Sequence, residues 1–249
     1  TFVDIIIDEA HDPYNEYPFK GNVDLSKLEK VVKKYGAKRI PYISVATNVN
    51  LAGGQPISIA NLRELRRFTR KHGIRIIHDM TRVAENAYFI QQREKGYRKK
   101  SVKEIVKEIC SLTDGATMSA KKDALVNMGG FIALKNEELA NKCRDLLIIT
   151  EGFSTYGGLS GRDMEAIATG LQEVFDPAYL HYRIKSTAYL GEHLNRAGVP
   201  VMLPVGGHAV YIDAKLLYPH IPPHEYPGQA LVAELYLTGG IRAVEIGSL

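Results

Sequence analysis

The feature that most constrains the fold is an alternation of short apolar segments with longer segments of helical period. Apolar, strand-like runs lie at residues 2–7, 40–46, 74–78, 116–119 and 129–134, and helical patterns follow the first three. Such alternation is typical of proteins in which helices cover a β-sheet. The sequence therefore predicts an α/β fold.

Capping residues mark where several of these helices begin and end. Asp24, Ser58 and Ser101 stand where a side-chain oxygen can accept from the first-turn N–H groups. Gly36 and Gly73 follow the first two patterns and can end them in a left-handed conformation. We therefore expect helices close to residues 25–35, 59–72 and 102–109.

The second part of the chain has a different order of elements. Two long helical patterns at residues 161–175 and 179–197 precede a short strand pattern at 209–212 and a helical pattern at 229–237. This order indicates a smaller α+β unit. We place a large α/β domain at residues 1–165, and connecting helices with part of a small C-terminal domain at residues 166–249.

Composition excludes several classes of protein. With 45% hydrophobic and 24% charged residues, the chain resembles neither a disordered tail nor a fibre. No apolar run approaches the roughly 18 residues that a membrane-spanning helix needs, and no signal peptide opens the chain. We expect a cytoplasmic protein without a membrane partner. Cys110 and Cys143, the only cysteines, are expected to be reduced thiols.

The ends of the chain also bear on function. The sequence begins at Thr1 without an initiator methionine and stops within the apolar stretch around Ile246. We therefore expect the chain to be part of a longer protein. An inactive fragment with a structural role is one alternative to an enzyme.

Polar side chains follow three consecutive predicted strands. They are Asn50, Asp79 with Arg82, and Ser119 with Lys121 and Lys122. Because parallel strands bring their carboxyl ends to one edge of a sheet, we expect these groups to converge. Taken singly, an Asp at a strand end is more often a helix cap, and a Lys-Lys pair is more often a solvated surface.

Together these groups match the needs of pyridoxal 5'-phosphate. A lysine with a lowered pKa can bond covalently to the cofactor aldehyde, and a carboxylate can keep the pyridine nitrogen protonated. Asn50 and Arg82 could donate to the ring oxygen, and Ser119 could bind a phosphate oxygen.

Four longer motifs resemble those of the aromatic amino-acid β-eliminating lyases, the family of tryptophanase and tyrosine phenol-lyase. They are residues 50–56 (NLAGGQP), 84–90 (AENAYFI), 118–123 (MSAKKD) and 206–210 (GGHAV). The resemblance implies fold type I, pyridoxal phosphate and a carbon–carbon lyase. It implies that Lys122 forms the Schiff base, with Lys121 as the second candidate. It also implies that Asp79 faces the pyridine nitrogen, Arg82 and Asn50 contact the ring oxygen, and Ser119 contacts phosphate.

The resemblance also bears on the substrate. Ile246 matches the position where tyrosine phenol-lyase has an arginine for the phenol oxygen, and with Phe153 and Val244 it implies an apolar pocket. This favours the tryptophanase branch, which cleaves L-tryptophan to indole, pyruvate and ammonia. Residues 49–51 and 126–128 look closer to tyrosine phenol-lyase, so cleavage of L-tyrosine to phenol, pyruvate and ammonia is the alternative.

Further implications concern parts outside the central site. The resemblance implies potassium near a subunit interface, with the Asn127 carbonyl as one ligand, and a homotetramer built as a dimer of dimers. It places the ring-stacking aromatic residue upstream of this chain and the substrate-carboxylate arginine downstream.

Basic stretches at residues 63–75 and 93–103 suggest nucleic-acid binding as a rival function, but acidic residues interrupt both stretches. We expect no nucleic-acid partner.

Overall fold

The computed structural model describes residues 2–153 and 158–247, in which a four-stranded mixed sheet forms the centre. The strands are β1 (Tyr42–Ala46), β2 (Arg75–Asp79), β3 (Gly115–Ser119) and β4 (Gly130–Leu134). They lie in the order β1-β2-β3-β4, with β1, β2 and β3 parallel and β4 antiparallel to β3. The α/β fold class is therefore confirmed.

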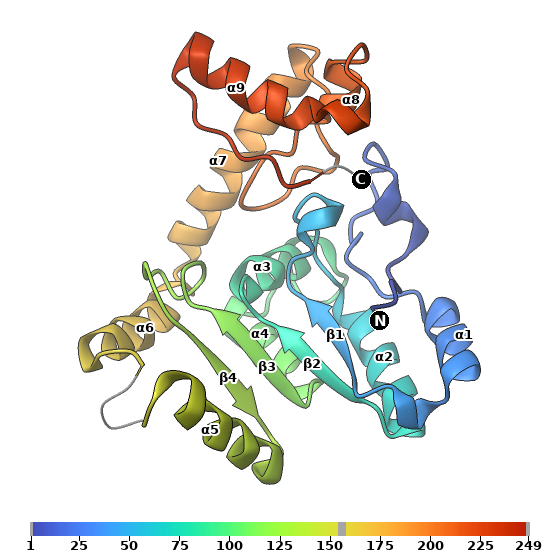
Figure 1. The fold of residues 1–249 in the computed structure, drawn as a ribbon, viewed down its shortest axis with the longest axis vertical. Helices are drawn as coiled ribbons and strands as arrows, with labels where there is room; N and C mark the ends of the chain where they lie inside the picture. Colours follow the sequence, from blue (N-terminus) through green and yellow to red (C-terminus); the bar gives the residue numbers. More distant parts are fainter. Residues whose placement is uncertain (1, 154–157, 248–249) are drawn as a thin grey trace.

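Helices pack around this sheet and extend away from it (Figure 1). The first five are α1 (Leu25–Tyr35), α2 (Ile59–His72), α3 (Val83–Arg93), α4 (Val102–Ser111) and α5 (Glu137–Glu151). The remaining four are α6 (Gly161–Glu173), α7 (Pro177–Arg196), α8 (Ala214–Leu217) and α9 (Pro227–Gly239). In Figure 1, α7 runs from the sheet region toward α8 and α9.

The predicted caps are present. Asp24 accepts from the N–H groups of Ser26 and Lys27, and Ser58 accepts from that of Asn61. Ser101 and Glu104 form a reciprocal capping box at the start of α4. Because these bonds satisfy N–H groups that have no partner within the helix, the local sequence fixes where the helices begin.

Two predicted strands are wrong. Within residues 2–7 only Ile6 forms a bridge, to Val23, and a 3₁₀ helix starts at once at Asp8–His11. Within residues 209–212 only Ile212 forms a bridge, to Val201. In both places a single bridge forms without a ladder, and in the first run Phe2 and Val3 are exposed to solvent.

Two clusters of apolar side chains form the core. The larger one joins β1 and β2 to helices α2, α3 and α4, with fully buried Ile76, Leu65, Ile90 and Ile105 among its members. The smaller one joins Met118, Ala120 and Ala124 to Ile167 of α6. Its position matters for function, because residues 120–124 form the loop that carries Lys122. The predicted domain boundary at residue 165 stays a prediction.

Candidate functional site

The carboxyl ends of the three parallel strands meet at one edge of the sheet. The register pairs Ala46 with Asp79 and Asp79 with Thr117. Past the strands, the Thr47 N–H donates to the Asp79 carbonyl at 2.9 Å, and the Met80 N–H donates to the Thr117 carbonyl at 2.9 Å. The expected convergence of the three polar loops is therefore present.

Asp79 is half-buried at the end of β2, and its loop contacts the lysine loop through Thr81. The Thr81 N–H donates to Asp79 Oδ1 at 3.1 Å, and Thr81 Oγ1 accepts from the Ser119 N–H at 3.1 Å. The Thr81 carbonyl accepts from the Asp123 N–H at 3.3 Å. Thr81, which the sequence reasoning missed, thus connects the two loops by hydrogen bonds.

Lys122 lies at this edge with its amine directed to Ser119. Its Nζ donates to Ser119 Oγ at 3.1 Å. Burial lowers the pKa of the Lys122 amine, and the nearby cations Arg82 and Lys121 lower it further, while Asp79 acts in the opposite direction. A lowered pKa leaves more of the amine unprotonated near neutral pH, which is the form that attacks a carbonyl carbon.

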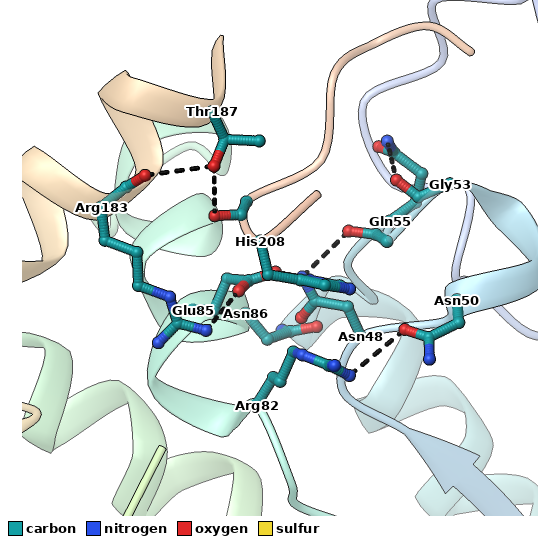
Figure 2. Close-up of polar contacts among 12 residues, drawn as sticks. Asn48, Asn50, Gly53, Gln55, Arg82, Glu85, Asn86, Arg183, Thr187 and His208 are labelled. Carbon is teal, nitrogen blue, oxygen red and sulfur yellow. Dashed lines mark hydrogen bonds and ion pairs between the residues drawn. The ribbon is translucent and has the colours of Figure 1, made fainter. Parts of the chain in front are cut away.

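Asn50 and Arg82 come together across two different loops. Arg82 Nη1 donates to Asn50 Oδ1 at 3.2 Å (Figure 2). Arg82 occupies the N-cap position of α3, and Asn50 opens a short 3₁₀ helix after β1. Because Asn50 uses its oxygen for this contact, its Nδ2 group can still donate to a ligand.

Behind this edge lies a buried ionic cluster that the sequence reasoning missed. Glu85, which is fully buried, pairs with Arg183 Nη2 at 2.8 Å and with His208 Nδ1 at 2.7 Å, and accepts from Asn48 Nδ2 at 2.6 Å (Figure 2). Arg183 Nη1 pairs with Asp123 Oδ1 at 2.9 Å. We call Glu85, Asp123, Arg183 and His208 the ionic cluster.

His208 has a hydrogen bond at each ring nitrogen. Since a carboxylate only accepts, Nδ1 donates to Glu85, and Nε2 forms a hydrogen bond with the Tyr211 hydroxyl at 3.1 Å. Burial raises the pKa of Tyr211, so this hydroxyl keeps its proton. His208 is thus hydrogen-bonded within the fold at both ring nitrogens.

The predicted substrate-pocket residues lie on exposed parts of the chain. The exposed fractions are 49% for Phe153, 76% for Val244 and 53% for Ile246. Val244 and Ile246 belong to an irregular segment after α9. Their grouping into one pocket stays a prediction.

The metal and nucleic-acid expectations have different outcomes. Asn127 is exposed in the turn between β3 and β4. Among the described residues, no group of three or more His, Cys, Asp or Glu side chains could hold a metal ion, and the potassium site stays a prediction.

In the basic stretch of α2, Arg63 pairs with Glu108 and Arg66 pairs with Asp114. These arginines are therefore engaged in ion pairs within the fold.

Two smaller expectations concern the membrane and the thiols. No helix in the described part of the chain is both long and apolar enough to cross a membrane. Cys110 and Cys143 are half-buried free thiols, as expected.

Comparison with known proteins gives matches along the whole chain. The family described as Beta-eliminating lyase matches residues 1–249. The chain is 56% identical to the tyrosine phenol-lyase of Symbiobacterium thermophilum, over 99% of this chain and 54% of that protein. It is 57% identical to the tryptophanase of Salinibacter ruber, over 99% of this chain and 52% of that protein. The chain thus spans about half the length of the curated relatives it matches.

Solved structures share the fold at low sequence identity. A protein from Listeria monocytogenes described as an L-allo-threonine aldolase aligns with a TM-score of 0.58 and 16% identity, over 91% of this chain and 56% of that one. A protein from Exiguobacterium described as an aromatic amino acid beta-eliminating lyase/threonine aldolase gives a TM-score of 0.52 and 20% identity, over 69% of this chain and 44% of that one.

Proposed function

Because the chain belongs to the β-eliminating lyase family, we propose that it carries the cofactor-binding centre of a pyridoxal-phosphate-dependent carbon–carbon lyase. The observation that carries the proposal is the Lys122 amine, 3.1 Å from the Ser119 hydroxyl, with its pKa lowered by burial and cations. It lies at the same sheet edge as the Asp79 carboxylate.

The donor set at this edge fits pyridoxal phosphate. The Lys122 amine would hold the cofactor aldehyde, the Ser119 hydroxyl would donate to a phosphate oxygen, and Arg82 with Asn50 would donate to the ring oxygen. The Asp79 carboxylate would hold a proton at the pyridine nitrogen. Each group has the charge and hydrogen-bonding capacity that its partner on the cofactor requires.

A residue of this chain also accounts for the removal of the substrate α-proton. When bound, the cofactor supplies an electron sink for negative charge at the substrate α-carbon. The Lys122 amine would take the α-proton, because its lowered pKa favours the neutral form that acts as a base. Arg82 and Lys121 favour its return to the neutral form.

We propose L-tryptophan as the substrate, with indole, pyruvate and ammonia as products. The support is Ile246, an apolar residue with no donor for a phenol oxygen, together with Phe153 and Val244. L-Tyrosine is the second candidate, because a relative described as tyrosine phenol-lyase shares nearly as much identity with the chain as the tryptophanase does, 56% against 57%. A potassium ion at the Asn127 carbonyl, a cytoplasmic location and a homotetramer belong to the same proposal.

The lysine assignment is tested by trapping the cofactor on the full-length protein. The wild type, Lys122→Ala and Lys121→Ala are mixed with pyridoxal phosphate, reduced with borohydride and mapped by peptide mass spectrometry. We expect the cofactor adduct on Lys122 in the wild type and in Lys121→Ala, and its loss in Lys122→Ala. An adduct that persists in Lys122→Ala would overturn the assignment.

The substrate is tested on the same protein by measuring pyruvate release from each amino acid separately. Indole and phenol are quantified alongside, so that each elimination is identified by its own leaving group. A wild type that releases phenol faster than indole at equal substrate concentration would replace tryptophan with tyrosine.

A further inference from the structure

We propose that Arg183 is a positioning residue for Lys122, acting through the buried carboxylate of Asp123. The inference rests on the proposed function, since it concerns how the cofactor lysine is held. Arg183 lies on α7, 61 positions after Lys122 in the chain. It therefore connects the long helix to the loop at the sheet edge.

Asp123, the residue directly after Lys122, is held in place by its own side chain. Its side chain is fully buried, and both carboxylate oxygens have a partner. Oδ1 pairs with Arg183 Nη1 at 2.9 Å, and Oδ2 accepts from the Ala84 N–H at the start of α3 at 2.7 Å. The carboxylate thus links the lysine loop to two helices at once, which leaves the backbone at residue 123 little freedom to turn.

The backbone of Asp123 also helps to set the position of Lys122 relative to Asp79. The Asp123 N–H donates to the Thr81 carbonyl, and Thr81 in turn contacts Asp79 and Ser119. A change at Asp123 would therefore alter the separation of the amine and carboxylate that the cofactor must bridge.

Arg183 makes this arrangement possible because it balances two buried negative charges. Glu85 and Asp123 are both fully buried, and Arg183 gives a different guanidinium nitrogen to each, at 2.8 Å and 2.9 Å. Burial raises the pKa of the Asp123 carboxyl, and Arg183 opposes that rise. Without the guanidinium, Asp123 would take up a proton or turn toward solvent, because an unpaired buried charge is strongly unfavourable.

The geometry also explains why an arginine is needed. The guanidinium presents nitrogens in a planar fork, whereas a lysine presents a single charged nitrogen. Arg183→Lys would keep the positive charge but could not place a different nitrogen against each carboxylate. The Arg183→Lys variant therefore shows whether Lys122 is held by the positive charge alone or by the two separate contacts of the guanidinium.

The experiment measures the reactivity of Lys122 in the full-length protein without cofactor. Acetylation by acetic anhydride is followed at Lys122 against pH by peptide mass spectrometry. The matched control is Arg66→Gln, because Arg66 has the same side-chain exposure of 17% and also makes two bonds to a carboxylate. That carboxylate belongs to Asp114, which precedes β3, whereas the lysine loop follows this strand.

We expect Arg183→Gln to raise the pH midpoint of Lys122 acetylation by about one unit. The loosened loop exposes the amine to water and moves it away from Arg82. We expect a smaller rise in Arg183→Lys and an unchanged midpoint in Arg66→Gln. A midpoint in Arg183→Gln equal to that of the wild type would overturn the proposal.

Thermal unfolding of each variant shows whether it folds. If Arg183→Gln does not fold, Arg183→Lys, which keeps the buried positive charge, decides the matter, and an unchanged midpoint there overturns the proposal. Borohydride trapping on the wild type tests the proposed function separately. Failure to trap the cofactor on Lys122 would refute that function, whereas the acetylation midpoints report only on how Lys122 is held.

Discussion

At the scale of single residues, His78 makes the fold sensitive to acid. It is fully buried next to Asp79, its Nε2 lies 2.8 Å from Thr47 Oγ1, and its Nδ1 has no hydrogen-bond partner in the described chain. Burial lowers the pKa of His78 to about 4. The folded protein therefore favours the neutral ring, so the stabilisation is complete above the ordinary pKa of about 6.5 and is lost as the pH falls toward 4.

We expect this one ring to change the free energy of unfolding by about 3 kcal/mol between pH 7 and pH 4. The measurement is chemical denaturation at several pH values for the wild type, His78→Gln and His224→Gln, whose side chain is 80% exposed. The wild type and His224→Gln should lose more stability in acid than His78→Gln. Equal losses in all three proteins would contradict the assignment.

Residues at strand ends could be predicted, whereas buried charge partners could not. Asp79, Ser119 and Lys122 follow predicted strands, and the rule that parallel strands end at one sheet edge was enough to group them. Arg183 meets Asp123 across 60 residues and Glu85 across 98. No local pattern carries such pairings, because they depend on where α7 packs after the whole domain has folded.

At the scale of elements, α6 packs directly against the lysine loop. A Cβ atom at Gly170 would lie 1.8 Å from the Ala124 carbonyl oxygen, whereas one at Gly161, at the start of the same helix, would meet nothing within 4 Å. The close approach therefore requires glycine at position 170. It places the α6 backbone next to the residues that follow Lys122.

We expect Gly170→Ala to destabilise the protein by about 1–3 kcal/mol, because α6 or the loop must shift to admit a methyl group. Gly161→Ala should be neutral or slightly stabilising, since alanine restricts the unfolded chain more than glycine does. Urea denaturation of the two variants provides the comparison. Similar stability in both would show that the α6 contact is looser than described.

Elements with clear caps and one apolar face were predictable, and elements without them were missed. Helix α3 escaped prediction because residues 83–90 are all buried, including Glu85 and Asn86, so the segment has no polar face. Helix α5 carries four consecutive apolar residues at 146–149, all exposed in this chain, which obscure a helical period. The run at residues 2–7 has β-branched residues but pairs only through Ile6.

At the scale of the whole molecule, the proposed choice of substrate rests on the irregular segment after α9. Val244 and Ile246 are exposed here, and the chain spans only about half the length of the curated relatives. The sequence could identify these positions only through resemblance, because no local rule relates an irregular segment after α9 to a pocket. Their role must therefore be tested in the full-length protein.

We expect Ile246→Arg in the full-length protein to shift the ratio of kcat/KM for L-tyrosine to that for L-tryptophan at least about tenfold toward tyrosine. The guanidinium would donate to a phenol oxygen, and it would place an unpaired charge against indole. Ile241→Arg is the control, because Ile241 is 55% exposed in the same segment but outside the predicted pocket. If both variants change the ratio equally, the effect is one of general charge, and Ile246 does not line the pocket.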